Sequence, residues 1–275
     1  MKTVILGALL TGMTLTSFSQ TDTTTAKSDT IRVGGMIIVK RPGKNGGESR
    51  EVIISNRRRT KLTNVSTNWW IVDLGFANYK DETNYAAAQQ SGFVTSGITG
   101  KDNLKLRTGK SVNVNIWVFM QKLNLAKHYV NLKYGLGVEL NNYRFDDERV
   151  RFTKNPTTVG FDPALANADK NKLAADYVTV PVMLNFNFTP GRHRGFGLSA
   201  GVSAGYLYSA RQKIKMNGDK DKLKDDFNLE KWKLSYIAEL SLGPVRLYGS
   251  MAMKNMWERG LNQTPYNVGI RFSHF

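Results

Sequence analysis

The chain has 275 residues, no cysteine and a formal net charge of +17 at pH 7. The lack of cysteine excludes disulfides, thiolate catalysis and zinc–thiolate sites, and it is compatible with a protein that leaves the reducing cytoplasm. The excess of lysine and arginine favours contact with phosphate, whether on nucleic acid, phospholipid or lipopolysaccharide, and charge alone does not choose among these.

Residues 1–19 have the features of a cleaved signal peptide. Lys2 gives a positive start, an apolar segment runs from Val4 to Leu15, and Ser17–Ser19 is a small-x-small cleavage site. The alternative is an N-terminal membrane anchor, but the apolar segment is shorter than the roughly 20 residues that a spanning helix needs. Since no later segment holds such a run, we expect any membrane crossing to be made by β-strands.

Residues 20–66 are predicted to form a periplasmic linker with a basic hairpin. A Thr-rich leader at 21–29 has little to bury, and the β-like runs 31–40 and 51–55 flank the turn-forming stretch 42–47. Four cations follow, here called the basic cluster: Arg57, Arg58, Arg59 and Lys61. This cluster is either a solvated segment or a contact for inner-leaflet phosphates or a periplasmic partner.

From residue 67 to residue 275 the apolar residues recur with period two. In 130–140 every second residue is apolar and the intervening ones are polar or small, and 112–120, 178–188 and 198–206 repeat the pattern. Weaker versions lie at 70–76, 232–242, 245–253 and 266–272. A strand with this alternation has one apolar and one polar face. About eight such strands are predicted, an even number as in single-chain bacterial barrels.

The connections between these strands alternate in length. Long stretches occupy 80–109, 142–174, 211–228 and 254–264, whereas 124–127, 189–194 and 243–244 are tight. Long outer loops and short periplasmic turns are typical of outer-membrane barrels, and both termini are then periplasmic. Aromatic residues are expected to form belts at the two ends: Trp69, Trp70, Tyr129, Phe188, Phe196 and Phe272 at the turn end, and Tyr79, Tyr143, Tyr177, Tyr208, Trp232 and Tyr266 at the loop end.

Three segments carry a family resemblance: Gly135–Phe145, Tyr177–Leu184 and Lys224–Leu229. They resemble the outer-membrane β-barrel domain proteins of Bacteroidetes, the group described as PorT-like or porin-family. The resemblance covers residue 67 to the C-terminus and implies a signal-bearing outer-membrane barrel, in a group mostly of unassigned function. One departure is Phe275, which does not share the lipid-facing register of Phe272, so either a bulge lies near Ser273 or the assembly signal is read differently.

The sequence offers little for catalysis or metal binding. The three histidines, His128, His193 and His274, fall at the predicted periplasmic edge, whereas barrel enzymes generally build their sites at the outer end. The acidic stretch from Asp219 to Asp226 lacks the glycine and terminal glutamate of a calcium loop and is interleaved with lysines. We therefore expect no catalytic residue, no cofactor and no metal.

The inward register carries charges on several strands. An eight-stranded barrel has an interior filled by side chains, so these charges are predicted to form a salt-bridged plug, and the alternative is a narrow ion path. The predicted lumen charges are Asp73, Lys133, Glu139, Lys233, Glu239, Arg246 and Arg271.

The sequence thus predicts an all-β, transmembrane, antiparallel up-and-down barrel of the bacterial outer membrane, with a short N-terminal periplasmic hairpin segment. Its expected role is structural, surface-interacting or in envelope assembly, without catalysis. Its expected partners are outer-membrane lipid, lipopolysaccharide and an envelope protein complex, and not nucleic acid, because the cations belong to an exported chain. The alternatives are a small porin or ligand-binding barrel for a small solute, and a soluble lipocalin-like carrier.

Overall fold

The computed structural model describes residues 29–33, 36–42, 48–54, 62–95, 97–192 and 195–273, with side chains from residue 62 onward. The chain divides into two compact units, Met1–Arg57 and Arg58–Phe275. Within the ranges given above, helices are all too short or too polar to cross a membrane. The predicted signal peptide, the basic cluster, His193, His274 and Phe275 lie outside the described residues.

The first unit contains a three-stranded antiparallel sheet. Its strands are β1 (Asp29–Val33), β2 (Met36–Pro42) and β3 (Glu48–Ile54), in the order β1-β2-β3. The second and third strands pair as a hairpin, with Lys40 opposite Arg50. The predicted single run at 31–40 is instead divided between β1 and β2, which pair with each other. Gly34 and Gly35 separate the two strands in the sequence.

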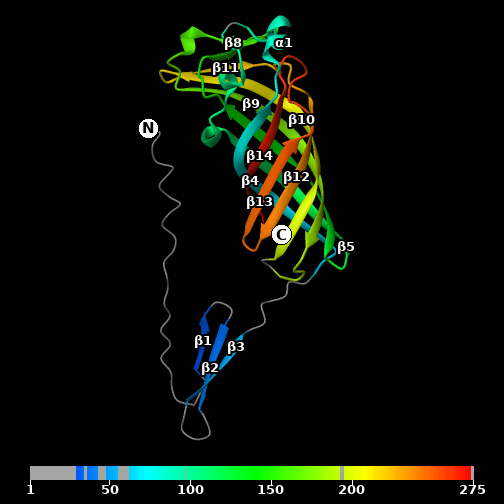
Figure 1. Ribbon diagram of the computed structural model, residues 1–275. Coiled ribbons are helices and arrows are strands. Elements are labelled where there is room, and N and C mark those ends of the chain that lie inside the picture. The colour runs from blue at the N-terminus through cyan, green and yellow to red at the C-terminus, as the bar shows by residue number, and fades with distance from the viewer. Residues whose placement is uncertain are drawn as a thin grey trace, which may run out of the picture. The chain divides into compact units, whose positions relative to one another are not determined.

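The second unit is built on a closed ring of eight strands (Figure 1). They are β4 (Val65–Asp81), β5 (Val112–Ala126), β6 (Val130–Arg144), β9 (Lys170–Asn187), β10 (Phe196–Met216), β12 (Trp232–Leu242), β13 (Val245–Ala252) and β14 (Gln263–Phe272). All neighbours are antiparallel, and the pairings of β14 with β4 and of β9 with β10 complete the ring. The predicted fold class is confirmed: the chain is all-β and the strands form an antiparallel barrel.

The period-two pattern decides which side chains face the lumen. In β9, Thr179 is 1% exposed, whereas its neighbour Val180 is 44% exposed. The same contrast recurs around the ring, so an apolar band covers the outside. Members of this band include Leu74, Leu136, Val182, Leu184, Leu198, Val202, Leu234, Leu247, Val268 and Ile270.

The strands of the ring are longer on one side than the sequence pattern predicts. The ninth and tenth strands, β9 and β10, begin and end beyond the apolar runs, at Lys170 and Met216, and β10 also pairs with β11 (Asp219–Lys224) (Figure 1). The predicted loop 211–228 is therefore largely a β-hairpin. The hydrophobic pattern misses this extension because its alternate residues are lysine and arginine rather than apolar.

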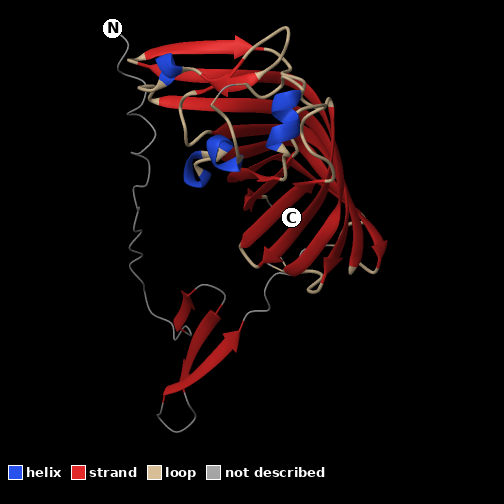
Figure 2. Ribbon diagram, turned by 45° about the horizontal axis from the view of Figure 1, so that its top comes forward, coloured by secondary structure: helices blue, strands red, loops and turns tan. Residues whose placement is uncertain are grey.

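The long connections also contain regular structure of their own. The first holds α1 (Tyr85–Gln90), η1 (Lys101–Leu104) and η2 (Thr108–Lys110), and the second holds β7 (Val150–Phe152), β8 (Val159–Phe161) and η3 (Pro163–Leu165). These elements gather at one end of the ring, here called the loop end (Figure 2). The other, turn end has tight connections such as Gly243–Pro244, where Gly243 takes the positive φ of 65° that such a turn requires.

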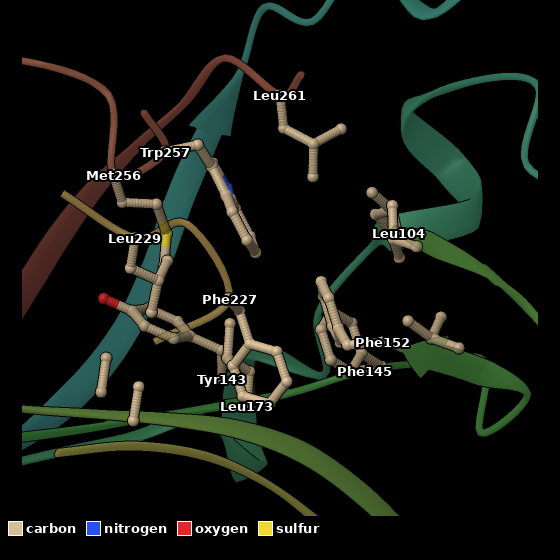
Figure 3. Close-up of a cluster of buried hydrophobic side chains, with 14 of the residues drawn as sticks. Leu104, Tyr143, Phe145, Phe152, Leu173, Phe227, Leu229, Met256, Trp257 and Leu261 are labelled. Carbon is tan, nitrogen blue, oxygen red and sulfur yellow. The ribbon is translucent and has the colours of Figure 1, made fainter. Parts of the chain in front are cut away.

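The largest hydrophobic core of the second unit lies at the loop end, beyond the stretch of the ring that the apolar band covers. It is here called the loop cap. Trp257 stacks on Phe152, with ring centroids 5.6 Å apart, and meets Phe93 edge-on at 5.9 Å. Figure 3 shows side chains from several segments, among them Leu104, Phe227 and Met256, gathered around Trp257 and Phe152. Besides Phe93, Phe152 and Trp257, the buried members include Tyr85, Val94, Ile98, Leu104, Leu106, Tyr143, Phe145, Val150, Val159, Leu173, Tyr177, Leu207, Phe227, Leu229, Met256 and Leu261.

The loop cap corrects part of the predicted aromatic belt. Tyr143 and Tyr177 are only 1% and 2% exposed, and Tyr79 packs against the same cluster. All three belong to the inward register and form the floor of the cap, with Tyr79 and Tyr143 rings 5.9 Å apart. The predicted lipid-facing aromatics Tyr208, Trp232 and Tyr266 are exposed on the outside, as are the six at the turn end. Inward-facing tyrosines therefore line the loop end of the lumen beneath the cap.

Candidate functional site

The candidate site is the lumen of the ring, where alternate residues of four strands supply buried charges. Each of these strands alternates apolar and polar residues, so its apolar side chains face outward and its polar side chains collect in the lumen. The set, here called the lumen network, comprises Asp73 on β4, Lys133 and Glu139 on β6, Lys233 and Glu239 on β12, and Arg271 on β14. All are less than 10% exposed.

Arg271 joins the two carboxylates at the centre of the network. Its Nε and Nη2 donate to the two oxygens of Asp73 at 2.7 and 2.8 Å, and its Nη1 donates to Glu239 Oε2 at 2.5 Å. Glu239 also pairs with Lys133, whose Nζ donates to both carboxylate oxygens at 2.7 Å. The guanidinium carbon also lies 5.5 Å from the Trp117 ring centroid. This bidentate fork fixes the orientation of Asp73 and the rotamer of Arg271 together.

A second ion pair lies nearer the loop end. Lys233 Nζ donates to Glu139 Oε1, and the same ammonium lies 5.2 Å from the ring centroid of Tyr177 in the floor of the loop cap. Glu139 Oε1 also accepts from the Nδ2 atoms of Asn141 and Asn267, both at 3.1 Å. The carboxylate is therefore held by one charged and two neutral donors.

A chain of asparagines connects the two ion clusters. Asn115 donates to Asp73 at 3.1 Å, and Asn113 donates to the side-chain oxygens of Asn115 at 3.0 Å and of Asn141 at 2.9 Å. The Tyr248 hydroxyl donates to Asn113 Oδ1 from across the lumen. Each amide both accepts and donates, so the ladder satisfies buried polar atoms without adding charge.

The lumen network is balanced in charge. Three carboxylates, Asp73, Glu139 and Glu239, face three cations, Lys133, Lys233 and Arg271, and every member has an opposite charge within an ion pair. Taking ions out of water is costly unless they are paired and hydrogen-bonded, and these six meet both conditions. The arrangement can cross-link strands from opposite sides of the ring.

Arg246, the seventh predicted lumen residue, stands apart from the network. It is 8% exposed and donates through Nη1 to the carbonyl and hydroxyl of Ser273. It also lines a pocket of about 60 Å³ at the turn end, together with Lys122, Arg192 and Glu239. A cavity of about 30 Å³ lies between the ion clusters, bordered by Asn115, Thr179 and Arg271. Spaces of this size hold at most a few water molecules.

The remaining candidates fall elsewhere. His128 lies in the turn between β5 and β6 with a positive φ of 61°. Asp219 and Asp221 are part of β11, and Asp225 and Asp226 follow it. Across the part of the chain that the structure describes, no three residues among His, Asp and Glu come together as a metal-binding group.

Sequence reasoning missed the asparagine ladder, Trp117 and the whole loop cap. The signal for the first two was present, because Asn113, Asn115 and Trp117 occupy the inward positions of a predicted strand. The Trp117 indole donates to Asp73 Oδ2 at 2.8 Å, which a register argument alone does not reveal. The loop cap joins residues more than 150 positions apart, such as Phe93 and Trp257, and no local pattern connects them.

A closed ring of eight amphipathic strands, with an apolar exterior and a hydrogen-bonded interior, is the architecture of an integral membrane β-barrel. Residues 76–263 match the family model described as outer membrane protein beta-barrel domain. This match covers more than half of the 275 residues, and the chain belongs to that family. No curated protein matches the chain.

Proposed function

We propose that the protein is a closed barrel of the bacterial outer membrane, which serves a structural, surface-interacting or envelope-assembly role and performs no catalysis. The observation that carries the proposal is the double closure of the lumen. The lumen network crosses the interior, and the loop cap lies above it, with Tyr177 of the cap in contact with Lys233 of the network. We further propose that the chain is one of the PorT-like barrels of Bacteroidetes.

The orientation follows from the lengths of the connections. Short turns face the periplasm and long loops face the outside in barrels of this kind, so the loop cap is extracellular. A folded cap over the mouth of the barrel restricts the passage of solutes and presents loops on a rigid scaffold, where binding residues are often found. The extracellular cap therefore supports the surface-interacting form of the role, alone or within an envelope complex.

The alternative, a small porin, requires a continuous wet path. Beneath the cap, such a path must cross the Arg271 contacts with both Asp73 and Glu239. Opening it would separate ions that are buried and paired, which costs several kcal/mol per partner. The geometry of the lumen therefore supports a barrel that does not conduct.

Planar-bilayer recording tests the proposal. The purified full chain, inserted at a density verified by immunodetection, is expected to give no stable single-channel steps, while an open porin reconstituted in the same way serves as positive control. Reproducible steps whose ion selectivity changes in Glu239→Gln, and not in the exposed loop variant Asp102→Asn, would overturn the closed-barrel proposal.

A further inference from the structure

The outer surface of the extension formed by β9, β10 and β11 is strongly cationic, and the lumen plays no part in it. Gln212 and Ile214 on β10 are only 0% and 5% exposed, so their side chains face inward. The residues that alternate with them along the strand point to the opposite, outer side. This surface is here called the cationic face, and it comprises Arg144, Lys170, Lys172, Arg211, Lys213, Lys215, Lys220, Lys222 and Lys224.

The strand register places like charges directly opposite one another. One row runs across four strands, from Arg144 on β6 to Lys172, Lys213 and Lys222. A second row pairs Lys215 on β10 with Lys170 on one side and Lys220 on the other. Opposed side chains in antiparallel strands have Cβ atoms only about 4.5–5.5 Å apart, and like charges there destabilise the sheet.

Nearby carboxylates neutralise only part of this charge. Asp176 pairs with Arg211, and Asp169 lies 3.7 Å from Lys215 Nζ. Burial, together with the positive charges of Lys170, Lys213 and Arg211, lowers the pKa of Lys172 to about 8 in this extension beyond the membrane. Two neighbouring strands that repel each other in this way are stabilised by an anion that bridges them.

The level of the face relative to the membrane identifies the anion. The exposed aromatics Tyr206, Tyr208 and Trp232 mark the headgroup depth at the loop end, and the Tyr206 and Trp232 rings pack edge-on at 5.1 Å. Arg211 and Lys215 follow Tyr208 by three and seven residues, which is about 10 and 23 Å along the strand. The apolar band directly below the aromatics includes Val180 and Val202. A ligand that fits this surface therefore has acyl chains that contact the apolar band and several phosphates that contact the cations above it.

We propose that the cationic face binds the phosphate groups of lipopolysaccharide in the outer leaflet beside the barrel. Lysine and arginine bind phosphate through charge-assisted hydrogen bonds, and opposed rows of cations match a lipid that bears more than one phosphate. The inference rests on the outer-membrane placement of the proposed function, but it does not depend on whether the lumen conducts.

The test compares two triple variants with the same change in charge. The first, Lys172→Gln with Lys213→Gln and Lys222→Gln, removes three of the four cations in the row that begins at Arg144. The second is a control on the exposed connection between β4 and β5, and consists of Lys101→Gln, Lys105→Gln and Lys110→Gln. The full-length proteins in nanodiscs are titrated with lipopolysaccharide, with phosphatase-treated lipopolysaccharide and with phosphatidylglycerol vesicles, and thermal unfolding is recorded with and without each lipid.

Lipopolysaccharide is expected to bind the wild-type protein and raise its Tm. The first variant should bind at least tenfold more weakly, and the control less than twofold more weakly. In nanodiscs to which no lipid has been added, the first variant should unfold at a higher temperature than the wild type, because the opposed charges on β9, β10 and β11 are gone. Equal weakening in both variants, equal binding of phosphatase-treated lipopolysaccharide, or equal binding of phosphatidylglycerol would each overturn the proposal. Since conductance is measured separately, this outcome is independent of the closed-barrel proposal.

Discussion

Arg271→Gln removes the cation that joins two buried carboxylates. In the folded protein this guanidinium makes two bonds to Asp73 and one to Glu239, at 2.7, 2.8 and 2.5 Å. Glu239 keeps Lys133 as a partner, but Asp73 retains only the neutral donors Asn115 and Trp117. Breaking one side of a buried ion pair costs about 3–5 kcal/mol. The unfolding equilibrium should therefore shift by about 150- to 5,000-fold.

A double-mutant cycle separates the pair from its surroundings. In the double variant Asp73→Asn with Arg271→Gln, the side-chain oxygen at position 73 can still accept from Asn115 and Trp117, and its NH2 group can donate to the glutamine at position 271. Because one carboxylate and one cation have been removed together, the lumen is again balanced in charge. Replacing a buried ion pair by neutral groups is often nearly neutral, and we expect the double variant to recover at least about 2 kcal/mol of the single-variant loss.

Urea unfolding in lipid vesicles, followed by tryptophan fluorescence, measures these differences. The exposed variant Asp102→Asn is the control and should leave the transition unchanged. If Arg271→Gln costs less than about 1 kcal/mol, or if the two single variants simply add, the ion pair does not cross-link β4 and β14 as the geometry indicates.

Three further changes test other parts of the molecule. Gly137→Ala should destabilise the ring by about 1–3 kcal/mol in urea unfolding, because its Cβ would lie 2.5 Å from the Ile116 carbonyl oxygen, whereas Gly109→Ala has open space and should be silent. Trp257→Ala should cost the loop cap about 3–5 kcal/mol, so external protease should cut the loops while the ring survives, unlike in the exposed control Lys254→Ala. Replacing the basic cluster by glutamine should reduce partner recovery in affinity purification from detergent-extracted envelopes, and unchanged partners would refute a binding role for it.

The ring was predictable because each spanning strand obeys one local rule. In 178–188 the alternation of valine, leucine and phenylalanine with polar residues is enough to assign both the strand and its two faces. The same parity argument places Asp73, Glu239 and Arg271 in the lumen. It also places Tyr143 and Tyr177 inward, where the structure has them, and the belt prediction was wrong at these positions because it used residue type instead of register.

The rest depends on contacts that no local pattern encodes. The extension of β10 alternates Arg211, Lys213 and Lys215 with glutamine, isoleucine and methionine, and that of β9 alternates lysine with asparagine and leucine. The outer face is therefore polar and does not have the pattern of a lipid-facing strand. The loop cap brings Phe93, Phe152 and Trp257 together from three connections, and only the closed ring places those connections at one end. Which carboxylate faces which cation also depends on the strand order around the ring, because Arg271 and Asp73 are adjacent only through the pairing of β14 with β4.

The absence of cysteine allows the two faces of one strand to be tested directly. Single cysteines at each position from Val178 to Asn185, spin-labelled in lipid vesicles, report access to oxygen, which concentrates in the bilayer. The account predicts high access at the even positions and low access at the odd ones, with a period of two residues. Uniform access, or high access at the odd positions, would contradict a barrel with its apolar side chains in lipid and its polar side chains enclosed.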